Sequence, residues 1–155
     1  MYAKRSVSTR IAKYLFVVII FMGIISSLSL IVMASNKSDA EAINISGSLR
    51  MQSYRLLTEM ERSPDTVEQN LVRYQRSLNA EALLSVQNQL FAPSGVRESY
   101  QKILQRWAVM SDFARAHQIE KYHAELKSYV QDVDDFVLEL QRFAEQKWIS
   151  AVSVL

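Results

Sequence analysis

Residues 14–34 read YLFVVIIFMGIISSLSLIVMA, a run of 21 residues without a charged side chain. An α-helix rises about 1.5 Å per residue, so a helix of this length spans roughly 30 Å, the thickness of a bilayer's hydrocarbon core. A cleaved signal peptide is the competing interpretation, but its apolar region is typically about 7–15 residues long. Because this run is longer, the sequence predicts an uncleaved transmembrane helix over 14–34.

Charge is distributed unevenly on the two sides of this run. Four bases and no acid lie among residues 1–13, and the positive-inside rule places that segment in the cytoplasm. The other fourteen bases and all sixteen acids lie between Lys37 and Lys147, which gives that stretch a net charge of −2. A mildly acidic domain lacks the clustered basic surface that phosphate contacts need, so no nucleic-acid partner is expected.

The other end of the sequence also has the character of a membrane boundary. After Lys147 it reads WISAVSVL, in which an aromatic residue typical of the membrane interface precedes small and apolar residues. We expect residues 148–155 to begin a second, truncated membrane helix that belongs to a longer protein. Residues 35–147 are then an extracytoplasmic domain between two membrane spans.

This domain is predicted to be all-α. Three Gly and two Pro in 155 residues disfavour a turn-rich β protein. Apolar positions recur at steps of three and four, and the breaks at Ser63-Pro64 and in the loop 88–95 divide them into four helices. The expected helices cover 38–62 (continuous with the membrane helix), 65–85, 96–116 and 119–148. This spacing is typical of helices packed at shallow angles, so we expect an antiparallel four-helix bundle.

The same spacing predicts which side chains form the core of the bundle. On the first helix these are Ala42, Ile45, Leu49 and Leu56, with a break at Gln52. On the second helix they are Val67, Leu71, Tyr74 and Leu78. On the third they are Val96, Tyr100, Ile103, Trp107, Met110 and Ala114. On the fourth they are Tyr122, Leu126, Tyr129, Val133, Phe136, Leu140 and Phe143.

No metal site and no catalytic residue are expected. The chain has no Cys, and His117 and His123 are isolated, so a zinc site lacks its usual ligands. Asp132, Asp134 and Asp135 lie within a helix and lack the glycine-containing loop of a calcium site. We interpret these three carboxylates as part of a solvated face.

A second stripe on the first helix combines residues that rarely share a buried face. We call it the Gly–Arg seam, and its members at alternating steps of three and four are Ala40, Ile43, Gly47, Arg50, Tyr54 and Leu57. A Gly inside a helix costs about 1 kcal/mol relative to Ala, which is tolerated where another backbone must come close. An Arg one turn further on needs a neutralising partner if it is to be buried. The seam is therefore a candidate contact between two copies of the helix.

Two copies related by a two-fold axis would bring their Arg50 side chains face to face. At about 6 Å and an effective dielectric of about 20 the two charges repel by roughly 3 kcal/mol, and a small anion between them would reverse the sign. The planar donor fork of a guanidinium suits a planar oxyanion. The alternatives are that Arg50 extends into solvent or pairs with a Glu of its own chain. Arg55 lies about 140° around the helix from Arg50 and is the weaker candidate.

The run DAEAINISGSLRMQSYRL at 39–56 resembles the periplasmic P-box of nitrate/nitrite sensor histidine kinases of the NarX/NarQ type. The run YVQDVDDFVL at 129–138 resembles a second conserved segment of that family, with the NarQ branch the closer fit. One departure is Ser46, where Ala is usual, and it is not expected to alter the ligand.

The resemblance implies a homodimeric receptor of the bacterial inner membrane with a periplasmic sensor. Arg50 of each subunit would bind nitrate or nitrite and Gly47 would contribute its backbone, with Ile43, Met51 and Tyr54 as candidate neighbours. The second membrane helix would pass the signal to an ATP-dependent kinase that phosphorylates a response regulator. This segment contains no phosphoacceptor or nucleotide-binding motif, so we expect it to have no enzyme activity and no cofactor of its own.

Two other functions remain open. A chemoreceptor-type ectodomain would share the bundle but feed a methylation-type signalling domain. A structural, membrane-anchored dimerisation bundle would bind no ligand, so nitrate would leave its thermal stability unchanged.

Overall fold

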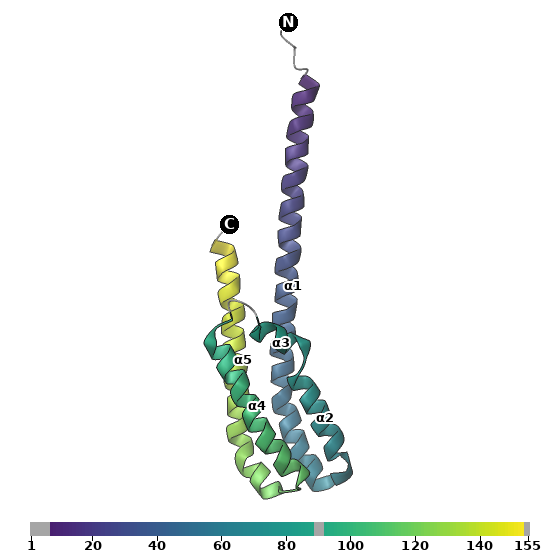
Figure 1. The fold of residues 1–155 in the computed structure, drawn as a ribbon, viewed down its shortest axis with the longest axis vertical. Coiled ribbons are helices and arrows are strands. Elements are labelled where there is room, and N and C mark those ends of the chain that lie inside the picture. Colours follow the sequence, from purple (N-terminus) through teal and green to yellow (C-terminus); the bar gives the residue numbers. More distant parts are fainter. Residues whose placement is uncertain (1–6, 89–91, 154–155) are drawn as a thin grey trace. The chain divides into compact units, whose positions relative to one another are not determined.

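The computed structural model describes residues 7–88 and 92–153 (Figure 1). Within these ranges the chain is helical and contains no strand, which confirms the predicted all-α class. In chain order the elements are α1 (Val7–Arg62), η1 (Pro64–Thr66), α2 (Val67–Leu78), α3 (Glu81–Gln87), α4 (Ser94–Arg115) and α5 (Ile119–Ser153). The chain divides into two compact units, 1–37 and 38–155.

Helix α1 runs without interruption from Val7 to Arg62, as expected from the absence of a breaker between the apolar run and residue 62. In the first unit the large apolar side chains from Ile11 to Met33 are 43–74% exposed. By length and composition α1 could cross a membrane, and it is the one helix of the described ranges that could.

The second unit has one apolar core, and the stripes predicted for the later helices form it. Every core residue predicted on α2, α4 and α5 is buried. Two core rings stack closely: Tyr74 of α2 lies on Trp107 of α4 with 3.6 Å between ring centroids. Helix α3 adds Ala82, Leu83 and Val86 to the same cluster.

On α1 the predicted stripe was partly wrong. Ile45 is only half-buried, whereas Ser46 and Ser53 are fully buried beside Leu49. A serine can be buried here because its hydroxyl bonds within its own helix: Ser46 Oγ donates to the carbonyl of Ala42 at 2.7 Å, and Ser53 Oγ to that of Leu49 at 2.8 Å. The buried positions therefore follow a strict heptad spacing, with serine at two of them.

The predicted helix over 65–85 is also wrong in detail, because it is interrupted between Leu78 and Glu81. Ala80 has an extended backbone, with φ −61° and ψ 139°. The carbonyl of Leu78, which a continuous helix would bond internally, instead accepts a hydrogen bond from the Tyr100 hydroxyl at 2.6 Å. The break redirects the chain so that α3 packs on the core.

Neighbouring helices of the second unit run antiparallel. Asp39 contacts Lys147, and further along α1 the carbonyl of Ser53 contacts Tyr122, so partner numbers on α5 fall as those on α1 rise. The same reversal relates α1 to α2, α2 to α4, and α4 to α5. This arrangement brings one side of α1 next to α5.

Helix bounds elsewhere lie close to the predicted ones. Pro64 opens the 3₁₀ helix, and the Ser63 side chain makes no capping hydrogen bond. Helix α4 begins at Ser94, two residues early, and part of the predicted loop 88–95 lies outside the described residues. Helix α5 continues to Ser153, while the rest of the predicted membrane segment 148–155 lies outside the described residues.

Candidate functional site

Arg50 lies on the side of α1 that adjoins α5, and its side chain is 54% exposed. Its Nη1 donates to Oδ1 of Asp134 on α5 at 3.0 Å. The sequence left open that Arg50 might pair with a Glu of its own chain, and the structure shows that a carboxylate of the same chain does contact it, from an Asp instead. Arg50 is therefore accessible to a ligand and already holds one negatively charged partner.

Gly47 precedes Arg50 by one turn on the Gly–Arg seam and is half-buried. A Cβ placed on Gly47 would meet no heavy atom within 4 Å. No contact with another described residue of the chain therefore requires a glycine at this position. The space beside it is open to a group from outside the chain.

The other residues of the Gly–Arg seam share this partial exposure, and none of the six is buried. Ile43 is half-buried, Tyr54 is 48% exposed, and the adjacent Met51 is 70% exposed. The three residues predicted to neighbour the ligand thus lie on the same accessible side of α1. An exposed strip of this composition is typical of a surface that contacts another molecule.

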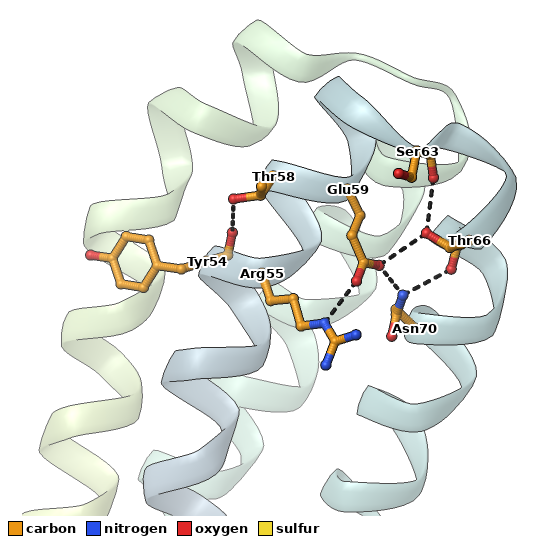
Figure 2. A network of polar contacts seen from close by, with 7 residues as sticks. All are labelled: Tyr54, Arg55, Thr58, Glu59, Ser63, Thr66 and Asn70. Atoms are coloured by element: carbon orange, nitrogen blue, oxygen red, sulfur yellow. Dashed lines mark hydrogen bonds and ion pairs between the residues drawn. The ribbon is translucent and has the colours of Figure 1, made fainter.

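Arg55 is separated from this strip and has a different partner. Figure 2 shows Tyr54 and Arg55 directed to different sides of α1, with Arg55 Nε donating to Oε1 of Glu59 at 2.7 Å. Glu59 also accepts from Thr66 Oγ1 at 3.3 Å and from Asn70 Nδ2, so this carboxylate ties α1 to the start of α2. Arg55 therefore belongs to a structural network beside the connection between α1 and α2.

The interpretation of Asp132, Asp134 and Asp135 as part of a solvated face was wrong for Asp132. Asp132 is buried, and its two oxygens lie 2.6 Å from Lys102 Nζ and 2.6 Å from Arg106 Nη1. Asp135 is exposed and accepts a hydrogen bond from Gln131 on its own helix. The sequence held one indication of this: Asp132 directly precedes the core position Val133.

Sequence reasoning also missed an ionic contact between α1 and α5. Lys147 Nζ lies 2.7 Å and 2.5 Å from the two carboxylate oxygens of Asp39, whose side chain is only 8% exposed. The ammonium also lies over the Phe143 ring, 4.7 Å from its centroid. Because the two residues are 108 positions apart, local sequence patterns give no indication of the pair.

A second missed feature is the set of hydrogen bonds made by three tyrosines whose burial was predicted, Tyr74, Tyr122 and Tyr129, which form a buried tyrosine cluster. The hydroxyls of Tyr74 and Tyr129 are 2.7 Å apart, and that of Tyr122 donates to the carbonyl of Ser53 at 3.0 Å. Burial raises the pKa of all three hydroxyls, because removal from water disfavours the charged phenolate. The cluster is therefore neutral around pH 7 and joins α1, α2 and α5 by uncharged hydrogen bonds.

The two histidines do not approach a set of ligands. His117 follows the end of α4 in the left-handed region, with φ 54°, and His123 is exposed on α5. Across residues 7–88 and 92–153, no group of three or more His, Cys, Asp or Glu side chains could hold a metal ion.

The first helix of the all-α unit continues from a candidate membrane span, as the sensor module of a transmembrane receptor would require. Residues 31–129 match the family model described as "PilJ: Type IV pili methyl-accepting chemotaxis transducer N-term". The match covers well over half of the chain, so the chain belongs to this family.

Two curated relatives narrow the class. The chain is 64% identical over 155 residues to "Sensor protein NarQ homolog" of Haemophilus influenzae and 32% identical over 154 residues to "Nitrate/nitrite sensor protein NarQ" of Escherichia coli. The alignments cover 100% and 99% of the chain but 27% of each relative, so the chain spans about a quarter of their length. The resemblance to NarQ-type sensors is confirmed, and the chain carries a sensor domain of the two-component class.

Proposed function

We propose that this domain senses nitrate or nitrite, and that the anion binds between the Arg50 side chains of two chains. The observation that carries the proposal is the Gly–Arg seam, in which an exposed guanidinium follows a Gly47 whose side is open. The name of the E. coli relative, a nitrate/nitrite sensor, supports the choice of ligand.

The geometry of the ligand explains the choice of Arg. Nitrate and nitrite are small planar anions, and a guanidinium presents a planar fork of donors to which they can bond in pairs. A lysine ammonium carries the same charge but no fork. Two guanidinium groups facing one anion replace their mutual repulsion by two attractions, so ligand binding would stabilise the paired α1 helices.

The test is calorimetric titration of nitrate into the wild type, Arg50→Lys and Arg50→Ala. We expect Arg50→Ala to abolish measurable binding and Arg50→Lys to weaken it at least about tenfold, because the charge remains while the fork is lost. Equal affinity of wild type and Arg50→Ala would refute the site. Near-wild-type affinity of Arg50→Lys would refute the two-fork geometry.

We further propose that residues 1–13 are cytoplasmic, 14–34 cross the bacterial inner membrane, 35–147 lie in the periplasm, and 148–155 begin the second span. The exposed apolar side chains of the first unit and the basic N-terminal segment support this orientation. The chain has no Cys, so single cysteines at Thr9 and Glu120 can be labelled in whole cells with a membrane-impermeant maleimide. Only the cysteine at 120 should react, and labelling at position 9 would refute the orientation.

In the whole protein, the domain would regulate an ATP-dependent histidine kinase and, through it, a response regulator. The second candidate output is the methylation-type signalling domain of a chemoreceptor, which the family description of residues 31–129 favours. Incubating the full-length protein with radiolabelled ATP distinguishes the two. Transfer of label to the protein itself supports the kinase, and its absence supports the chemoreceptor.

A further inference from the structure

Arg50 and Asp134 form one ionic contact between α1 and α5, and Asp39 and Lys147 form another. Their side chains are 54% and 41% exposed, so water competes with the pair on both sides. Exposed pairs of this kind stabilise a fold only weakly. The contact can therefore be opened by a competing anion without unfolding the domain.

The second contact, between Asp39 and Lys147, has the opposite character. The Asp39 carboxylate is almost fully shielded, and both of its oxygens contact the ammonium. Eleven residues separate Asp39 from Arg50, which is roughly 16 Å along the helix. Helices α1 and α5 are thus joined by two ion pairs at separate positions along the helices: the shielded tie, Asp39–Lys147, and the exposed tie, Arg50–Asp134.

The atoms used by the exposed tie decide what an incoming anion encounters. Asp134 occupies Nη1 of Arg50, one of the two terminal nitrogens that reach furthest from α1. An anion shared between two facing arginines would approach this same end of each guanidinium. Because the Asp134 carboxylate and the anion are both negative and accept from the same donors, they repel each other when both are present.

We propose that Asp134 is a competing counter-ion that nitrate or nitrite must displace from Arg50. Occupancy of the site then opens the exposed tie between α1 and α5, while the Asp39–Lys147 tie stays closed. The proposal rests on anion binding at Arg50 and adds the regulation of that site. Asp134 lowers the affinity for the anion and couples its binding to the contact between the first and last helices.

The test compares Asp134→Asn with Asp135→Asn in the membrane-embedded protein, by calorimetric titration of nitrate. Both variants remove one negative charge from the same part of α5, but Asp135 contacts Gln131 and not Arg50. Loss of a competitor in an exposed pair should tighten binding by a factor of two to three per subunit, and roughly fivefold for two subunits that share one anion. The control variant should change the dissociation constant less than about twofold, as expected for a screened surface charge.

The outcomes separate this proposal from the proposed function. If wild type binds nitrate, Arg50→Ala does not, and Asp134→Asn binds no more tightly than Asp135→Asn, the competition is refuted and the anion site stands. If wild type does not bind nitrate, both are refuted.

Structures of the wild type with and without nitrate give a second readout that needs no variant. The distance from Arg50 Nη1 to Asp134 Oδ1 should exceed 4 Å when nitrate is bound. A contact retained near its present 3.0 Å would overturn the proposal.

Discussion

Replacing Gly47 by Ala should have opposite effects on the stability of the single chain and on the contact between two chains. In the chain, the added Cβ meets no atom within 4 Å, so it causes no clash. Alanine is about 1 kcal/mol more favourable than glycine inside a helix. The substitution should therefore raise the free energy of unfolding of the monomeric chain by about 0.5–1 kcal/mol, or a few degrees in Tm.

In a pair of chains the same methyl group should be harmful. If the Gly–Arg seams of two α1 helices meet, each Cβ lies where the other backbone approaches, and overpacking of this kind costs about 1–3 kcal/mol. The two Arg50 side chains would also be held further apart than one anion can bridge. We expect the affinity for nitrate to fall about tenfold or more, equivalent to at least 1.4 kcal/mol.

The assay combines thermal unfolding followed by circular dichroism with nitrate titration. Unfolding is measured at concentrations where sedimentation shows a monomer. The control is Gly95→Ala at the start of α4, where the new Cβ would displace only the flexible end of Glu139 and nitrate affinity should stay unchanged. Unaltered nitrate affinity in Gly47→Ala would refute the close approach of two α1 helices. A lower Tm of the monomer would refute the absence of a clash beside Gly47 within the single chain.

Three further predictions concern the fold. Asp132→Ala should lower the free energy of unfolding by about 3 kcal/mol, because it removes a buried carboxylate that contacts both Lys102 and the partly buried Arg106. Asp135→Ala should change the same free energy by less than about 0.5 kcal/mol. Urea unfolding measures both variants, and equal effects would contradict the buried ion pair. His117→Gly should raise the same free energy by about 1 kcal/mol, because His117 occupies a left-handed position at the end of α4 that favours glycine; a loss of stability in the same assay would contradict this. Burial raises the pKa of the tyrosines of the cluster, so their contribution to the stability of the fold is fully present below about pH 10, the ordinary pKa of tyrosine. This contribution is lost as the pH rises above about 10, because the hydroxyls then ionise in the unfolded chain but not in the folded one. Absorbance at 295 nm should show these hydroxyls ionising only as the circular dichroism signal disappears, and ionisation in the folded state would contradict their burial.

The helices and most of the core could be predicted because they depend on local periodicity. Large apolar side chains at steps of three and four identify one face of a helix without knowledge of its partners. The method failed at Ser46, where a small polar residue is buried by bonding to its own helix. It also failed at Asn79–Ala80, where no Gly or Pro marks the break and a hydroxyl from α4 replaces a helical hydrogen bond.

The candidate site was predicted in part for the same reason. Gly47 and Arg50 belong to one helix, so their shared side follows from the sequence alone. The partner of Arg50 lies 84 residues away on another helix, and only the packed bundle determines that Asp134, and not Asp132 or Asp135, reaches it. Three nearby carboxylates with similar local sequence thus have three different environments, which periodicity cannot resolve.

The stoichiometry of nitrate binding, measured by calorimetric titration of the wild-type protein, tests the central claim most directly. An anion held between two Arg50 side chains requires one nitrate for every two chains, so the titration should end at a molar ratio of 0.5, and Arg50→Ala should abolish the heat of binding. One nitrate per chain, or binding that survives the loss of Arg50, would contradict a site shared across the Gly–Arg seam.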